Sequence, residues 1–229
     1  EETLLPMAGV VESVRGESWR EKLAVLSGPS FATEVAQHKP TTVCIASHNT
    51  RLARHVQAAF MTDWFRVYTQ DDVLGVELGG SLKNVIAIAA GACEAMKLGA
   101  NGRAALVTRG LAEIVRLDVA MGARSGTFFG LTGLGDLLLT CTDQQSRNYQ
   151  FGMLAAQGKS RDEAVEEIGM VVEGLRTTRS ARALARRHNI EMPITEEVYK
   201  VAYEGKPTAD ALRSLMQREA RPERENWQG

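Results

Sequence analysis

The sequence around Lys83 suggests that this residue could act in proton transfer. It lies in an apolar helical pattern, with Gly79-Gly80 just before it and Ala87 and Ala90 on the same helical face. Each glycine inside a helix costs about 1 kcal/mol relative to alanine, so we expect a backbone or a ligand to approach closely there. Small apolar neighbours would desolvate this lysine and disfavour its charged form, so that the ammonium form can donate a proton and the amine form can accept one near neutral pH. The alternative is a solvated lysine beside a helix–helix contact.

The segment from Ser27 to Ala32 (Ser-Gly-Pro-Ser-Phe-Ala) is a second candidate. The apolar run Leu23–Leu26 predicts a strand that ends in this turn. The turn would expose the backbone N–H groups of Ser30, Phe31 and Ala32 at the end of the strand, where open α/β sheets bind ligands. Local sequence alone favours an ordinary Gly-Pro turn.

Asp136 closes the glycine-rich stretch Gly130-Leu-Thr-Gly-Leu-Gly135, which is not a GxGxxG fingerprint. Its carboxylate could bind a substrate hydroxyl, pair with Lys83, or cap a helix over Leu137–Thr140. Local sequence slightly favours the cap.

Two further helix starts carry polar residues. Ser146 can cap a helix whose first turn contains Arg147 and Asn148, a combination suited to an oxyanion or phosphate. Plain capping with a solvated arginine is the alternative. In Val171-Val-Glu173, the acidic residue is favoured by the helix dipole, so capping is the local interpretation. The arginines that follow, from Arg176 to Arg187, lack interleaved aromatics and are interpreted as a solvated face.

Hydrophobic periodicity divides the chain into two parts. Residues 1–72 are α/β, with further strands at Thr41–Ala46 and Phe65–Tyr68 and a helix over Arg51–Met61. Beyond Asp71 and Asp72, which can cap a helix from Val73, only helices are predicted. The later helices are expected at 103–121, 146–157, 160–168, 173–188, 194–204 and 208–219.

Composition narrows the functional classes. The 229 residues carry a net charge of −1, so the chain lacks the overall positive charge that would favour binding to nucleic acid. No apolar run approaches the ~20 residues of a membrane span. The three dispersed cysteines form no CxxC pair and fit a reducing cytoplasm, and no metal-ligand spacing is present.

The motifs together resemble one family. The order Ser-Gly-Pro-Ser-Phe-Ala, Glu77-Leu-Gly-Gly-Ser-Leu-Lys-Asn-Val, Gly-Leu-Gly-Asp-Leu, Thr142-Asp-Gln-Gln-Ser-Arg-Asn and Val-Val-Glu-Gly is similar to bacterial NAD(P)-dependent glycerol-3-phosphate dehydrogenases. Thr108-Arg-Gly-Leu-Ala-Glu113 and Pro193-Ile-Thr-Glu-Glu197 also match.

The resemblance implies a remnant of a Rossmann-type domain (1–72) followed by an all-helical substrate and catalytic domain (73–229), similar to the C-terminal domain of 6-phosphogluconate dehydrogenase. It implies reversible reduction of dihydroxyacetone phosphate to sn-glycerol 3-phosphate with NAD or NADP, for glycerophospholipid synthesis, by a homodimer. Lys83 corresponds to the proton donor and acceptor. The implied substrate contacts are Gly28, Ser30, Lys83, Asp136, Ser146, Arg147 and Asn148, and the implied cofactor contacts are Ala32, Arg147, Val171 and Glu173.

One departure concerns the family's N-terminal GxGxxG unit, which this chain does not contain. We therefore expect a C-terminal portion of the enzyme that is inactive alone. The alternatives are a related dehydrogenase of the 3-hydroxyacyl-CoA or 6-phosphogluconate type, or a non-catalytic helical assembly module.

Overall fold

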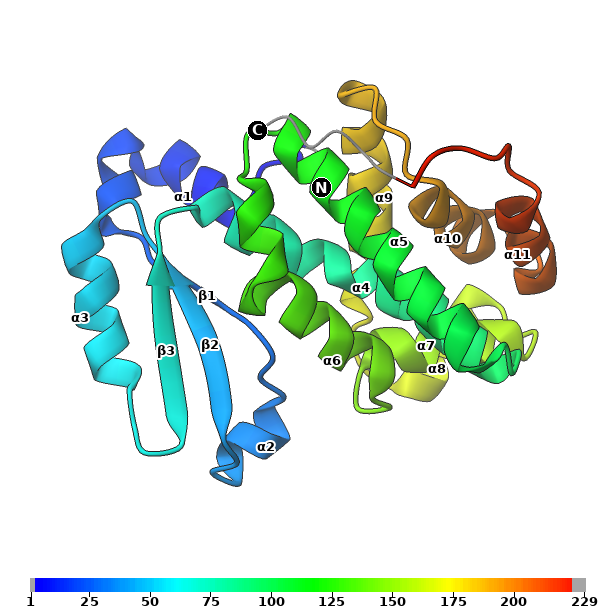
Figure 1. Ribbon diagram of the computed structural model, residues 1–229, viewed down its shortest axis with the longest axis horizontal. Coiled ribbons are helices and arrows are strands. Elements are labelled where there is room, and N and C mark those ends of the chain that lie inside the picture. The colour runs from blue at the N-terminus through cyan, green and yellow to red at the C-terminus, as the bar shows by residue number, and fades with distance from the viewer. Residues whose placement is uncertain (1–2, 224–229) are drawn as a thin grey trace.

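The computed structural model describes residues 3–223 and contains a small sheet beside a larger group of helices (Figure 1). The first part consists of α1 (Met7–Arg15), η1 (Glu17–Lys22), β1 (Val25–Ser27), α2 (Ala32–Ala36), β2 (Thr41–Ala46), α3 (Thr50–Phe60) and β3 (Phe65–Gln70). The helical part consists of α4 (Val73–Ala95), α5 (Gly99–Ala120), η2 (Ser125–Phe129), η3 (Leu131–Gly135), α6 (Asp136–Thr142), α7 (Arg147–Ala156), α8 (Arg161–Ile168), α9 (Glu173–Arg187), α10 (Pro193–Glu204) and α11 (Thr208–Met216).

The sheet has the order β1-β2-β3 and is mixed. Strand β2 pairs in parallel with β3 along its whole length, whereas β1 is antiparallel to β2. The β-branched and apolar residues of β2 explain its central place, since Val43 and Ile45 are fully buried. The strand predicted at Leu23–Leu26 lies instead at Val25–Ser27, because pairing with β2 begins only at Val25, opposite Ala46.

Helix α4 is the central element of the helical part. Its N-cap is Asp72, whose carboxylate accepts a hydrogen bond from the Gly75 amide at 3.0 Å. Asp71 instead pairs with Arg124 at 2.6 Å. By length and composition α4 could cross a bilayer, but 67% of its apolar window is buried by the protein around it. An all-round apolar helix of this kind is typical of a protein core.

The closest helix crossing joins α4 to α7. A Cβ atom on Gly91 of α4 would overlap the carbonyl oxygen of Tyr149, and one on Gly152 of α7 would overlap that of Ile88. The two backbones are therefore in direct contact. A side chain at either glycine would force the helices apart.

The predicted all-helical character of the region after residue 72 is confirmed for the described residues, which contain no strand beyond β3. The helix predicted at Arg103–Met121 begins earlier, at Gly99, because its start carries no side-chain cap that would mark it in the sequence. Helices α1 and α2 were not predicted. Neither has a buried residue or a side-chain cap, so the capping signal that marks a helix start in the sequence is absent there.

Two acidic side chains of α5 are fully buried. Glu113 accepts hydrogen bonds from the amides of Ile194 (2.6 Å) and Thr195 (3.1 Å) at the start of α10. It thereby joins α5 to α10, and burial raises the pKa of Glu113 to about 7. The carboxylate of Asp118, in contrast, has no hydrogen-bond partner among the described residues. Burial, with the nearby charge of Asp72, raises the pKa of Asp118 well above its ordinary value.

The glycine crossing gives a stability prediction. Gly152→Ala should lower the free energy of unfolding by at least about 3 kcal/mol, because the added methyl group overlaps backbone that cannot move aside cheaply. Chemical denaturation measures the loss. Gly126→Ala is the matched control, since no atom lies within 4 Å of its Cβ position. Equal stability of the two variants would contradict the close crossing.

Asp118 gives a pH-dependent prediction. Because the folded-state pKa of Asp118 is raised, its contribution to stability is fully present below the ordinary aspartate pKa of about 3.9 and is lost as pH rises through the folded-state value. Asp118→Asn should therefore stabilise the protein by about 2 kcal/mol near pH 8, and by much less at acidic pH. Thermal unfolding across pH tests this, with the exposed Asp162→Asn as control. A pH-independent difference would refute it.

Candidate active site

A cavity of about 380 Å³ lies between α4, β1 and the start of α1. Its lining brings together four of the residues singled out from the sequence: Gly28, Ser30, Lys83 and Asp136. Helix α4 supplies the floor, including Glu77, Gly80 and Lys83. This arrangement places one ammonium group in a partly enclosed space large enough for a small ligand.

Lys83 forms an ion pair with Asp136, with 2.5 Å between Nζ and Oδ2. Asp136 is almost fully buried, whereas 19% of the Lys83 side chain remains exposed. Asp136 begins α6 without capping it through its side chain, so the structure shows the pairing alternative and the cap interpretation is wrong. Thr140 donates a hydrogen bond to the Asp136 carbonyl at 2.6 Å and steadies this end of α6.

The glycine pair before Lys83 allows the Ser-Gly-Pro turn to approach α4. A Cβ atom on Gly80 would lie 2.7 Å from the hydroxyl oxygen of Ser27. That hydroxyl also lies 2.8 Å from the Thr132 hydroxyl. The close backbone approach expected from the sequence is confirmed at the other glycine of the pair, since a Cβ atom on Gly79 would lie 3.1 Å from the carbonyl oxygen of Thr132. The rule that ligands bind at the carboxyl ends of parallel strands does not apply to this turn, because β1 is antiparallel to β2. The position of the turn is explained by its packing on α4.

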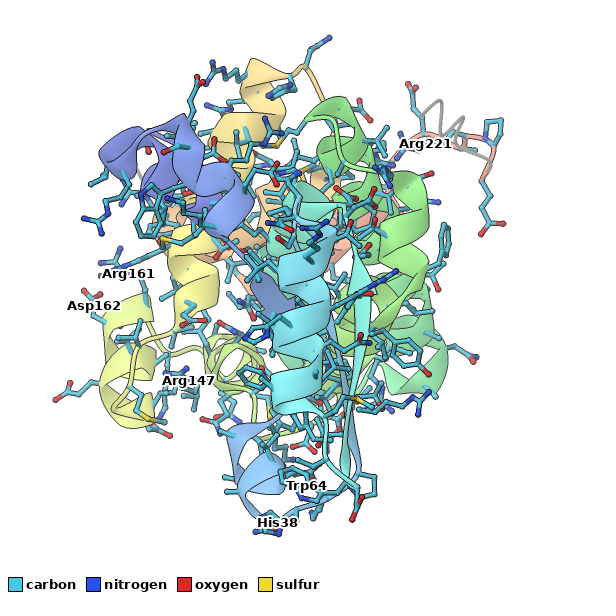
Figure 2. All side chains as sticks on the ribbon, turned by 90° about the vertical axis from the view of Figure 1, so that its left-hand side faces the viewer. His38, Trp64, Arg147, Arg161, Asp162 and Arg221 are labelled. Carbon is cyan, nitrogen blue, oxygen red and sulfur yellow. The ribbon has the colours of Figure 1, made fainter. Side chains whose placement is uncertain are left out.

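The start of α7 forms a second group of candidate residues. The Ser146 hydroxyl accepts the Tyr149 amide at 3.3 Å, as predicted for a cap. Arg147 is half-buried and makes no hydrogen bond or ion pair in the part of the chain that the structure describes. In Figure 2, Arg147 lies between Arg161 above it and the stacked rings of His38 and Trp64 below it. Arg147 and the first amides of α7 are therefore available to an anion.

A buried hydrogen-bond chain connects this second group to α4. The Asn148 amide nitrogen donates to Asn84 Oδ1 at 2.9 Å, and Asn148 Oδ1 accepts from the Gly174 amide at 2.8 Å. Asn84, Asn148 and Gly174 each follow a candidate residue directly: Lys83, Arg147 and Glu173. Sequence reasoning missed Asn84 and Gly174, since neither has a distinctive local pattern.

The remaining candidates lie at the edges of this region. Val171 is 58% exposed, just before Glu173 opens α9. Ala32 is exposed at the start of α2. Next to it, Thr33 donates a hydrogen bond to Gln145 Oε1 at 2.5 Å, which links α2 to the loop before Ser146. The candidates thus form two neighbouring groups, one around Lys83 and one around the starts of α7 and α9.

Comparison with known proteins matches both parts of the chain to one family. Residues 72–213 match the family model for the C-terminus of NAD-dependent glycerol-3-phosphate dehydrogenase, and residues 1–53 match the model for its N-terminus. The chain belongs to the NAD-dependent glycerol-3-phosphate dehydrogenase family.

Individual members of the glycerol-3-phosphate dehydrogenase family agree. The chain is 54% identical over 222 residues to glycerol-3-phosphate dehydrogenase [NAD(P)+] of Anaeromyxobacter dehalogenans, covering 97% of the chain and 67% of the relative. The Moorella thermoacetica enzyme is 53% identical, covering 88% and 60%. The crystal structure of glycerol-3-phosphate dehydrogenase from Coxiella burnetii superposes with a TM-score of 0.89 at 44% identity, covering 95% of this chain and 66% of that one. The chain therefore spans 60–67% of the length of these relatives.

Two adjacent residues give a discriminating prediction. Asn148→Ala should lower the free energy of unfolding by about 2 kcal/mol, because it leaves buried polar groups of Asn84 and Gly174 unpaired. Arg147→Ala should leave stability within about 0.5 kcal/mol, since the side chain has no internal partner in residues 3–223. Urea denaturation compares the two. A larger loss of stability in Arg147→Ala than in Asn148→Ala would show that the buried hydrogen bonds of Asn148 do not hold α7 and α9 together.

Proposed function

We propose that this chain forms the substrate-binding and catalytic part of an NAD(P)-dependent sn-glycerol-3-phosphate dehydrogenase. The proposed reaction is the reversible reduction of dihydroxyacetone phosphate to sn-glycerol 3-phosphate. The Lys83–Asp136 ion pair in a cavity of ligand size carries the proposal, and family membership supports it. No observation favours the related dehydrogenases or a non-catalytic assembly module.

Lys83 holds and transfers the proton. Its Nζ atom donates to the C2 oxygen as negative charge develops there, and accepts the proton in the reverse direction. The positive charge also polarises the C2 carbonyl before reaction. Asp136, only 2.5 Å from Nζ, orients the ammonium group. Since Asp136 is almost fully buried, this orientation is protected from solvent.

The substrate phosphate fits the start of α7. The amides of Arg147 and Asn148 stand in the first helical turn, where N–H groups lack intrahelical partners. The Arg147 guanidinium adds charge-assisted hydrogen bonds. Gly28 and Ser30 of the Ser-Gly-Pro turn, which line the cavity together with Lys83, contact the substrate backbone in this proposal. Asn148 contributes through its main chain, since its side-chain amide is already engaged.

The residues proposed for the cofactor fit a group that is both anionic and aromatic. Val171, 58% exposed, offers apolar surface, Arg147 offers a positive charge, and Glu173 and Ala32 begin α9 and α2. A bound NAD or NADP would supply or accept the hydride. The chain's own part is to present the C2 oxygen to Lys83 in a partly enclosed space.

The wider assignment is proposed on the same basis. Residues 1–72 form the end of the cofactor-binding α/β domain, and residues 73–229 form a helical domain similar to that of 6-phosphogluconate dehydrogenase. We place the enzyme in the cytoplasm as a homodimer that supplies glycerophospholipid synthesis. The chain alone is proposed to be inactive, because the relatives are longer.

The test replaces Lys83 in an active protein. The chain is joined to the N-terminal portion of the Anaeromyxobacter relative that it does not cover, and NADPH oxidation with dihydroxyacetone phosphate is measured. Lys83→Ala should lower kcat at least about 100-fold through loss of the proton donor. Because it also leaves the buried Asp136 carboxylate unpaired, it should lower the melting temperature, so circular dichroism at the assay temperature checks that the variant is folded. Lys97→Ala, an exposed lysine beyond the end of α4, is the control. Unchanged turnover in Lys83→Ala would refute the role of Lys83, and turnover by the chain alone would refute its proposed inactivity.

A further inference from the structure

The walls of the cavity around Lys83 differ in how tightly they are packed against the rest of the protein. The Ser-Gly-Pro turn is fixed by its close packing on Gly80 and by the Ser27–Thr132 contact. The Asp136 side is fixed by the ion pair. The wall opposite is the start of α1, where Pro6 and Met7 line the cavity.

Helix α1 itself is weakly held. None of its residues is buried, and the Met7 side chain is 68% exposed. Ala8 packs against the small cluster of Ala46, Val73 and Val76. Within residues 3–223, one hydrogen bond joins α1 to a sequence-distant element: the Ala8 amide donates to Glu77 Oε1 at 2.9 Å.

Glu77 is suited to this contact by charge and by position. Pro6, at the N-cap of α1, provides no side-chain cap, so the first amides of the helix need another acceptor. A carboxylate at a helix N-terminus is favoured by the dipole and makes a strong, charge-assisted hydrogen bond. Glu77 also stands on α4, nearly two turns before Lys83, and lines the same cavity. Partial burial raises the pKa of Glu77, which is consistent with a carboxylate enclosed between the two helices.

We propose that Glu77 is a positioning residue for the reaction at Lys83. By holding the first turn of α1 against α4, it fixes Pro6 and Met7 as the apolar wall of the cavity. The wall restricts water and limits the positions that a ligand can take beside the ammonium group. The proposal rests on the proposed function of Lys83, although Glu77 itself takes no part in proton transfer.

The first experiment tests whether Glu77 holds α1 in place, and it does not require enzyme activity. Hydrogen exchange followed by mass spectrometry compares the wild-type chain with Glu77→Ala. Exchange in the peptide covering α1 should accelerate about tenfold, as expected for loss of one charge-assisted hydrogen bond, while peptides from α5 and α9 stay unchanged. Glu94→Ala is the matched control, because Glu94 lies on the same helix but pairs with Arg103. Unchanged exchange in α1 would overturn the proposal.

The second experiment measures the consequence in the chain joined to the relative's N-terminal portion. Glu77→Ala should raise KM for dihydroxyacetone phosphate about tenfold with a smaller change in kcat. Glu77→Gln should have a KM close to that of the wild type, since its amide oxygen still accepts a hydrogen bond from the Ala8 amide. If Glu77→Ala does not fold, Glu77→Asp, which draws the carboxylate back by one methylene group, replaces it with the same expectations. An unchanged KM would overturn the positioning role. Absence of wild-type activity would instead count against the proposed function, and the exchange result would still decide whether Glu77 holds α1 in place.

Discussion

The direct contact between the backbones of α4 and α7 is the constraint on which the rest of the structure depends. At Gly91 and Gly152 no side chain separates the two helices. Because helices packed through glycine cannot slide or rotate without overlap, the crossing fixes α7 relative to α4. Lys83 on one helix and Arg147 on the other therefore have a defined separation. The core and the candidate active site are parts of the same packing arrangement.

The buried amide chain extends this constraint to a third helix. Asn148 reaches Asn84 on α4 and Gly174 on α9. A Cβ atom on Gly174 would lie 2.7 Å from Asn148 Oδ1, so the glycine is required for the contact. Three candidate residues, Lys83, Arg147 and Glu173, thus have sequence neighbours that bind one another in the interior. The polar interior orients the site, and the site residues remain open to ligands.

Sequence reasoning was most successful where the chemistry is local. The Gly79-Gly80 pair predicted a close approach at α4, and the structure shows Ser27 and Thr132 there. The Ser146 cap was also found, because the polar residue directly precedes its helix.

Contacts between distant segments could not be predicted in the same way. Asn148 was expected to face the substrate, whereas its side chain binds Asn84 and Gly174. Glu113 gave no signal of its role at the start of α10, 81 residues away. For Asp136, local rules favoured a cap, and the ion pair with Lys83 became certain only with the fold, because burial makes an opposite charge the stronger partner.

The hydrogen bond from Thr33 to Gln145 lies on the outside of this rigid arrangement. It is exposed, so water can replace it at a free-energy cost of only about 1 kcal/mol. The α4–α7 crossing, by comparison, cannot open without separating buried backbones. The link between α2 and the loop before α7 therefore depends on two surface side chains and not on buried packing. Substitutions at these two positions can loosen α2 while the α4–α7 crossing stays as it is.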